Sequence, residues 1–507
     1  MPLLGPWLVY LTSTVAVIAA AIYYFITTKF DYWKTRNIPY IQPSFPFGNF
    51  GKLYRKKITF SEAFEEFYRE FKTNGFGGVF NFRQPVFVVC DPELIKNVLT
   101  KDFGSFHDRG FVVDEDNDPF SANLFNLEGV RWKMLRAKLS PTFTSGKIKG
   151  MFPLILECCD QLNECIQERI KTNSSVEMQD LVIRFTTNVI GSCAFGMNCN
   201  SLKNPNSEFY KKTRDFFKHV ESFQAFAKFL LQNTFPNFAR KVKIGSVFGK
   251  FTKFFTEFMD SIVSHRRREK MERNDFVQLM MKVMDEDTDD MTFDLKLMTA
   301  QAFLFFVAGL DNVANTIGFS LHAMAIDPEL QERVRAEIVE VVGGNEGQIS
   351  YEALGHMGLV AGVIDETLRK YSPSPVLIRV QNEEKYKIPN TDIEIEKGTQ
   401  IIIPIQGLHN DEEFFPNPEK FDPDRFTEEE KSSRHPYTYI PFGEGPRFCI
   451  ASRFAKLEMR LCFAQLIRHF RFSIAPETDV KMEIDKSGLS VAPKNKFWLK
   501  VTERRTP

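Results

Sequence analysis

The stretch with the clearest chemical potential is residues 441–451, PFGEGPRFCIA, which runs directly into a helical pattern that begins near Ser452. Its glycines and prolines exclude regular helix and allow the backbone to pass close to a bulky group. Cys449 lies where the helix begins, and the free N–H groups and positive dipole end of a helix favour a thiolate over a thiol. A lone cysteine is usually a small buried hydrophobe, but these neighbours favour a metal-bound thiolate.

The pattern Pro-Phe-Gly-x-Gly-x-Arg-x-Cys-Ile in this stretch resembles the haem-binding signature of the cytochrome P450 family. The resemblance implies haem as the cofactor, with Cys449 as the thiolate ligand of its iron and Phe442 in the cofactor-binding loop; a thiolate ligand favours O–O cleavage. Arg447 is expected to meet a haem carboxylate with its planar guanidinium. Ala451 departs from the family, which usually has glycine there, and its methyl group predicts slightly less room beside the ring.

Two further segments resemble the parts of the family that bind the haem propionates. Trp132 and Arg136 are four residues apart and share one helix face. A Trp packed on an Arg stem is common on any helix, but the pair resembles the family's Trp-x-x-x-Arg helix. Arg379 resembles a further propionate ligand, on a strand. The resemblance therefore implies that Trp132, Arg136 and Arg379 bind the cofactor together with Arg447.

Residues 293–325 predict one long helix, with Thr292 as its N-cap and Pro328 beyond its end. About 33 residues span about 50 Å, enough to cross a whole domain, and the apolar run 302–307 predicts burial. Glycine and aspartate are unfavourable in such a helix, and these costs tend to persist where function needs them.

The middle of this helix resembles the family's Ala-Gly-x-Asp/Glu segment above the iron. The resemblance implies four catalytic residues: Ala308, Gly309, Asp311 and Asn312. Asn312 stands where the family usually has threonine. No single atom of an amide both donates and accepts a hydrogen bond, so we expect Asn312 to deliver protons less well than a hydroxyl.

Glu366 and Arg369 lie three residues apart on one predicted helix face. They resemble the family's Glu-x-x-Arg, and Arg425 falls in a segment that resembles its Pro-x-Arg-Phe. The resemblance implies a buried ion triad that holds the cysteine loop and takes no part in catalysis. Five residues are predicted to contact the substrate from their positions alone: Phe120, Phe306, Val376, Leu377 and Leu489.

The fold class that these patterns predict is mainly α with a small β-rich lobe, a cytochrome P450 fold behind an N-terminal transmembrane anchor. Nothing resembling a Gly/Ser or charged linker divides the 507 residues, so residues 52–507 are predicted to form one catalytic domain. Short hairpins are expected at residues 79–89, 388–405 and 481–501. Basic and acidic residues are equal at 65 each, which argues against a nucleic-acid partner.

Residues 1–28 carry no charge, and residues 7–26 are mostly apolar, enough to cross roughly 30 Å of hydrocarbon. A cleavable signal peptide is the alternative, but it needs a basic start and a shorter apolar core. Basic residues in the Pro-rich segment 29–51, predicted to be a hinge, place the catalytic domain in the cytosol. The chain is therefore expected on the endoplasmic reticulum membrane, and its cysteines show no disulfide or zinc spacing.

Basic residues gather on two predicted helices near the expected haem: Arg131, Lys133, Arg136 and Lys138 on one, Arg453 and Lys456 on the other. Such runs are usually a solvated face, but in the P450 family these helices border the surface where the electron donor docks. The chain lacks a dinucleotide motif, so NADPH–cytochrome P450 reductase is the expected donor, with cytochrome b5 as a further candidate. A Phe-rich region at residues 216–238 is expected to form a membrane-facing lid, with plain core packing as the alternative.

The order of these motifs resembles microsomal members of the family of the insect detoxification type. The resemblance implies a monooxygenase that inserts one atom of O2 into a lipophilic small molecule, such as a plant toxin or an insecticide, with electrons from NADPH. Two alternatives stay open. One is a membrane-tethered haem protein that acts as a carrier or sensor without turnover, and the other is a haem-thiolate enzyme that rearranges peroxides without a reductase.

Overall fold

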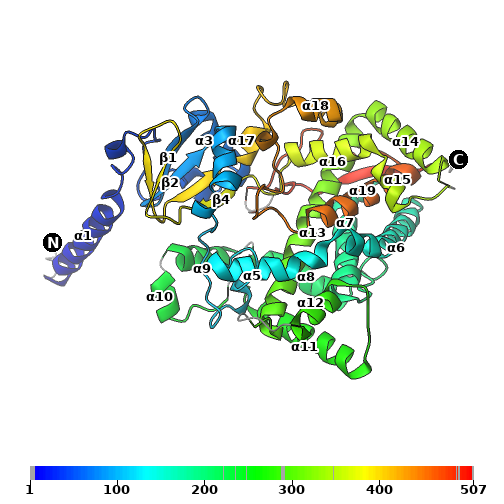
Figure 1. Ribbon diagram of the computed structural model, residues 1–507, viewed down its shortest axis with the longest axis horizontal. Coiled ribbons are helices and arrows are strands. Elements are labelled where there is room, and N and C mark those ends of the chain that lie inside the picture. The colour runs from blue at the N-terminus through cyan, green and yellow to red at the C-terminus, as the bar shows by residue number, and fades with distance from the viewer. Residues whose placement is uncertain are drawn as a thin grey trace, which may run out of the picture.

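The computed structural model describes residues 6–504 except 221, 235, 247, 287–291, 346, 487, 489 and 490. Long helices fill one side of the molecule, and the larger sheet lies on the side of the N-terminus (Figure 1). This arrangement confirms the expected fold class, mainly α with a small β-rich lobe.

The helices differ widely in length. They are α1 Pro6–Thr27, α2 Gly51–Tyr54, α3 Phe60–Phe71, α4 Pro92–Lys96, α5 Gly129–Leu139, α6 Ser145–Ile170, α7 Met178–Ile190, α8 Glu208–Val220, α9 Phe223–Thr234, α10 Pro236–Lys241, α11 Lys250–Glu269, α12 Phe276–Asp285, α13 Leu295–Ile326, α14 Pro328–Gly343, α15 Tyr351–Gly355, α16 Gly358–Lys370, α17 Ile405–His409, α18 Glu428–Ser433 and α19 Ser452–His469.

The strands are short. They are β1 Phe76–Asn81, β2 Gln84–Val89, β3 Val176–Glu177, β4 Leu377–Val380, β5 Lys385–Lys387, β6 Glu394–Glu396, β7 Gln400–Ile403, β8 Phe470–Ile474 and β9 Trp498–Glu503. They form a four-stranded sheet in the order β1-β2-β7-β4, a three-stranded sheet β3-β9-β8 and the pair β5-β6.

The hairpin expected at residues 79–89 is confirmed, since β1 and β2 are antiparallel partners. The second expected hairpin is only partly correct: β5 pairs with β6, but β7 leaves them to pair with β2 and β4. Ile401, Ile402 and Ile403 of β7 are all buried, so this strand gains more from the centre of a sheet than from a hairpin edge. In the third, a single bridge joins Ile484 to Pro493, and β9 pairs with β8 and β3.

The long helix expected at residues 293–325 is α13, which runs through the middle of the helical part (Figure 1). Its N-cap is Asp294, whose carboxylate accepts a hydrogen bond from the Leu297 amide at 2.8 Å. The prediction of Thr292 as N-cap is therefore wrong. Phe293 is already buried in the core before the helix begins, which brings Asp294 to the cap position.

Two helices among the described residues, α1 and α13, are long and apolar enough to cross a membrane. Most of α13 is buried inside the protein, as expected for a core helix. In contrast, α1 projects away from the rest of the molecule (Figure 1), and its apolar window is not buried at all. An N-terminal helix of this kind is compatible with a membrane anchor.

The segment expected to be a hinge packs onto the β-rich lobe. Trp33 is 1% exposed, and its indole N–H donates to the Val79 carbonyl at 3.0 Å. A Cβ atom at Gly78 would clash with the Trp33 ring, so only glycine lets the indole lie flat against β1. Tertiary packing at Trp33 therefore holds this segment against the lobe.

A buried carboxyl group lies in the main core on α19. Glu458 is fully buried, and both of its carboxylate oxygens are without a hydrogen-bond partner in the part of the chain that the structure describes. Burial raises the pKa of the Glu458 carboxyl well above its usual value. Burial therefore favours the protonated form of Glu458 over the carboxylate.

We expect Glu458→Gln to flatten the pH dependence of stability. The raised pKa lets the folded state hold a proton that the unfolded chain releases above about pH 4.3, so the free energy of unfolding falls as the pH rises further. Glutamine stays neutral, and the variant should lose less stability than the wild type between about pH 5 and about pH 8. Thermal unfolding followed by circular dichroism measures this, with the exposed Glu412→Gln as the control. Equal losses in Glu458→Gln and wild type would contradict the prediction.

Candidate active site

The loop before α19 contains two glycines in backbone conformations that only glycine adopts readily. Gly443 and Gly445 have φ angles of 71° and 72°, and a Cβ atom on Gly445 would clash with the Leu99 carbonyl. The Cys449 amide donates to the Phe442 carbonyl at 2.9 Å, which closes the loop just before the helix begins at Ser452. Cys449 is partly exposed, whereas the other seven cysteines are buried.

Positively charged side chains lie near the Cys449 thiol. Burial raises the pKa of the thiol, and the Ala451 amide and the guanidiniums of Arg136 and Arg109 act in the opposite direction. Arg136 lies over the Phe448 ring and donates to the Phe448 carbonyl at 3.0 Å. Both members of the predicted pair therefore face the cysteine loop, Arg136 at Phe448 and Trp132 at Arg447.

Arg447 packs on the indole ring of Trp132. Its guanidinium lies 4.0 Å above the Trp132 ring, donates to the Leu127 carbonyl at 2.8 Å and reaches Asp108 at 3.4 Å. Burial lowers the pKa of Arg447 to about 9. Arg379 on β4 is 1% exposed, its Nε has no partner among the described residues, and burial lowers its pKa to about 10.

Arg109 belongs to the same cluster, and the sequence analysis missed it. Its guanidinium donates to the Arg447 carbonyl at 3.1 Å and to the Phe125 carbonyl at 3.0 Å. Burial lowers its pKa well below the usual value, and Arg379 and Arg447 add to that shift. Arg109 follows His107 and Asp108 in a loop without a repeating pattern, so only its contacts reveal its place.

The donor set fits a haem. Arg109 interacts electrostatically with Arg136, Arg379 and Arg447 as well as with Cys449, so four like charges form one cluster, and their main acidic counterpart, Asp108, already lies 2.7 Å from His107. Burying so many cations is unfavourable unless an anion joins them. The two carboxylates of haem would supply that charge, and Cys449 would supply the ligand of its iron.

The α13 residues predicted to be catalytic differ in direction. A Cβ atom on Gly309 would lie 2.6 Å from Cδ1 of Ile190, so this glycine is fixed by the packing of α13 on α7. Ala308 is exposed, and leaving room above Cys449 stays a prediction for this residue. Asp311 and Asn312 are half-buried. The Asn312 amide nitrogen uses one of its two N–H groups to donate to the Ala308 carbonyl at 3.2 Å.

The Glu366–Arg369 pair is fully buried and bidentate. Arg369 donates from Nε and a terminal nitrogen to the two Glu366 oxygens at 2.7 and 2.8 Å, and its remaining bonds go to backbone carbonyls of His409 and Pro418. The third predicted member, Arg425, is farther away, at 3.7 Å from Glu366. The Asp422 amide donates to Glu366 at 3.0 Å, so the pair also fixes the chain around Arg425.

Two residues predicted to contact substrate are packed into an aromatic cluster. Phe120 stacks on Phe303 with 4.2 Å between the ring centroids, and Phe306 packs on Phe255 at 5.6 Å. Both predicted residues are at most 1% exposed, so contact with a substrate requires these rings to move. Val376 is buried, Leu377 is half-buried beside Gly443, and Leu489 lies outside the described residues.

The Phe-rich region 216–238 divides into two parts. Phe216 is 2% exposed and packs on Phe251, so it belongs to the core and the lid prediction is wrong for it. Phe229 and Phe238 are exposed, as a surface that faces lipid requires. Phe235 and the side chains of Phe223 and Phe226 lie outside the part that the structure describes.

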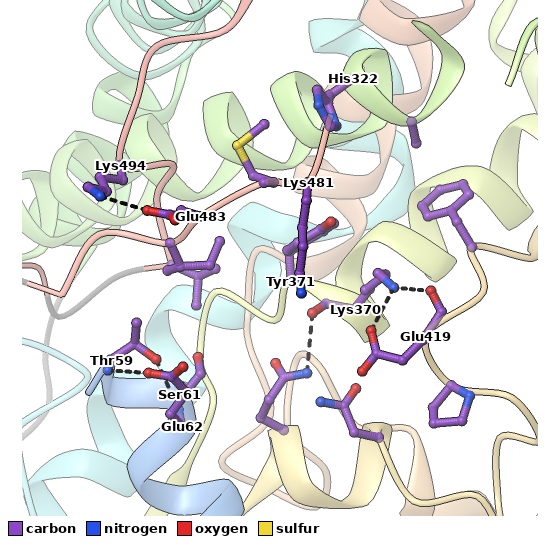
Figure 2. Close-up of a pocket in the computed structure, with 18 of the residues that line it drawn as sticks. Thr59, Ser61, Glu62, His322, Lys370, Tyr371, Glu419, Lys481, Glu483 and Lys494 are labelled. Atoms are coloured by element: carbon purple, nitrogen blue, oxygen red, sulfur yellow. Dashed lines mark hydrogen bonds and ion pairs between the residues drawn. The ribbon is translucent and has the colours of Figure 1, made fainter. Parts of the chain in front are cut away.

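A cavity of about 1050 Å³ lies apart from this site (Figure 2). It is lined by the start of α3, the ends of α13 and α16, and the segment around residues 480–494. Lys494 and Glu483 form an ion pair at 2.6 Å on its wall, and Lys370 pairs with Glu419. None of the predicted site residues is among the described residues that line this cavity.

Comparison with known proteins identifies the class. Residues 39–500 match the family model of cytochrome P450. The chain is 37% identical over 505 residues to probable cytochrome P450 6a14 of Drosophila melanogaster, covering 96% of this chain and 98% of that protein. It is 38% identical over 505 residues to cytochrome P450 6A1 of Musca domestica, covering 97% of each. The chain belongs to the cytochrome P450 family. It is a cytochrome P450 monooxygenase, and this membership implies haem bound through a cysteine thiolate.

We expect Arg109→Gln to weaken haem retention. The variant removes a cationic donor from the cluster, and one charge-assisted hydrogen bond of about 1.5 kcal/mol corresponds to roughly tenfold faster haem loss. The transfer of haem from purified protein to an excess of apomyoglobin measures this rate. Arg69→Gln, at an arginine whose side chain is 64% exposed, serves as the control. Wild-type retention in Arg109→Gln would show that this arginine does not hold the cofactor.

Proposed function

We propose that this monooxygenase inserts one atom of O2 into lipophilic xenobiotics, such as plant toxins or insecticides, with electrons that NADPH–cytochrome P450 reductase passes on from NADPH. The observation that carries the proposal is the partly exposed Cys449 beside the guanidiniums of Arg136 and Arg109, which form one cluster with Arg379 and Arg447. The many apolar rings above α13 favour lipophilic substrates over polar ones.

Bound haem supplies the activation of O2 and its transfer to the substrate. The chain holds and orients that group: Cys449 provides the thiolate, and Trp132, Phe442 and the arginines hold the ring and its carboxylates. Asp311 is the acid that brings protons to the space above Cys449. Asn312 can accept a hydrogen bond there through its carbonyl oxygen and donate one through its second N–H, since only one N–H is used by the bond to Ala308.

The reductase is proposed to dock beside α5 and α19. Lys133 is exposed and has no ion-pair partner among the described residues, whereas Arg131 is paired with Glu115 at 2.7 Å and Lys456 with Asp365 at 3.1 Å. A positive surface of this kind attracts an acidic partner and speeds the encounter at low salt. Cytochrome b5 is a second partner that the same charge would attract.

The protein is proposed to lie on the endoplasmic reticulum membrane, with α1 as the anchor and the catalytic domain in the cytosol. Besides α1, the α9–α10 region offers apolar contact: Phe238 is 55% exposed and Val242 is 49% exposed. The basic residues Arg240 and Lys241 lie between them in the chain, as in surfaces that bind the headgroup region.

Reconstitution tests the function. Purified protein is mixed with reductase, NADPH and a panel of lipophilic toxins, and NADPH consumption and oxidised product are measured. The reduced carbon monoxide adduct should show the red-shifted Soret band of a thiolate ligand, and Cys449→Ser should lose it. A thiolate band without turnover on any toxin would favour a carrier or sensor, and conversion of a lipid hydroperoxide without NADPH would favour a peroxide-rearranging enzyme.

We expect Asn312→Thr to improve coupling, because a hydroxyl both donates and accepts through one oxygen atom. The variant should release less H2O2 per NADPH and form more product, measured with one confirmed substrate. Asp311→Asn should slow turnover by about 10²-fold, the usual contribution of a positioned acid or base. Equal or poorer coupling in Asn312→Thr would show that Asn312 belongs to an adapted route for protons.

A further inference from the structure

His409 connects two parts of the molecule that the sequence motifs leave separate. It is the last residue of α17, is fully buried, and lies between the end of α16 and the loop that leads to Cys449. Its Nδ1 lies 3.3 Å from the Arg369 carbonyl, and its Nε2 lies 3.3 Å from the Ile440 amide. Its own carbonyl accepts a bond from the Arg369 guanidinium at 2.7 Å.

These partners fix the protonation state of the ring. The Arg369 carbonyl can only accept a hydrogen bond, so Nδ1 carries the proton, and the Ile440 amide can only donate, so Nε2 is bare. Burial and the Arg369 charge lower the pKa of His409 to about 3, which agrees with a neutral ring. The ring also packs beside Tyr439, with 5.2 Å between centroids.

Losing the hydrogen bond of one ring nitrogen would cost more than losing that of the other. The Arg369 carbonyl has a second donor, since the Gln406 amide reaches it at 3.3 Å. The Ile440 amide is buried, and His409 Nε2 is its one acceptor in the described part of the chain. Loss of Nε2 would therefore leave a buried N–H unpaired, which is the costlier of the two losses.

Ile440 stands at the base of the cysteine loop. Its carbonyl accepts from the Gly443 amide at 2.9 Å, and Phe442 accepts from the Cys449 amide at 2.9 Å. A continuous set of bonds thus leads from Glu366 through Arg369, His409 and Ile440 to the loop of Cys449. Each member is buried except the loop itself.

We propose that His409 is a positioning residue: its neutral, Nδ1-protonated ring transfers the position of the buried Glu366–Arg369 pair to the cysteine loop by holding the Ile440 amide. The thiolate of Cys449 then stays in place relative to the guanidinium cluster while haem is bound. This role rests on the proposed ligation of haem by Cys449.

The test separates the two ring nitrogens. Glutamine carries its amide oxygen near the position of Nε2, and asparagine carries its amide nitrogen near the position of Nδ1. His409→Gln therefore keeps an acceptor for Ile440, whereas His409→Asn keeps only the donor to Arg369. His322→Asn is the matched control, since this buried histidine also bonds a backbone carbonyl, that of Asp479 at 3.0 Å, at the far end of α13.

The measurement is the stability of the red-shifted Soret band in the reduced carbon monoxide adduct, together with the haem-to-protein ratio and the melting temperature. In His409→Asn the band should decay at least about fivefold faster than in wild type while haem remains bound, because the arginine cluster is intact. His409→Gln should decay at the wild-type rate. The His322→Asn control should change the melting temperature without changing the band.

Equal loss of the band in the Gln and Asn variants, or wild-type decay in His409→Asn, would overturn the proposal. If His409→Asn does not accumulate, hydrogen exchange of residues 436–443 in His409→Gln decides: wild-type protection supports the role of Nε2, and faster exchange overturns it. Wild-type protein without the red-shifted band would overturn the thiolate ligation first, and this inference with it.

Discussion

The buried Glu366–Arg369 pair is the interaction on which the site depends. Two charges removed from water are tolerated only when their geometry is good and their remaining hydrogen-bonding groups are satisfied. Arg369 meets that condition by bonding Glu366 twice and two backbone carbonyls besides. Segments far apart in the chain must therefore converge on one guanidinium, and through His409 the cysteine loop is part of that convergence.

Around Cys449, in contrast to the Glu366–Arg369 pair, most of the charges have the same sign. Here four guanidiniums gather with little acidic compensation, an arrangement that a dianionic group would stabilise. Glu458 on α19 shows the other response to burial without a counter-ion: its pKa is raised, so the protonated form is favoured.

The sequence predicted what is encoded locally. The glycines of residues 443–445 and the spacing of Glu366 and Arg369 are properties of one turn or one helix face, and both were foreseen. Arg109 and His409 were not, because their importance lies in contacts outside their own helix or loop: Arg109 with Arg447, 338 positions away, and His409 with Ile440, 31 positions away. The same reason explains β7, which burial draws from a local hairpin into a distant sheet, and Phe120, whose partners come from α11 and α13.

The buried indole of Trp33 has a mechanical consequence. Only about 20 Å of extended chain can separate the end of α1 from this ring, so the connection between the apolar helix and the β-rich lobe has almost no slack. Because this connection is so short, a tilt of α1 would turn the β-rich lobe with it. With α1 as the proposed membrane anchor, a partner that diffuses along the same bilayer would meet the protein in a narrow range of orientations, and its search for a productive encounter would be confined to two dimensions.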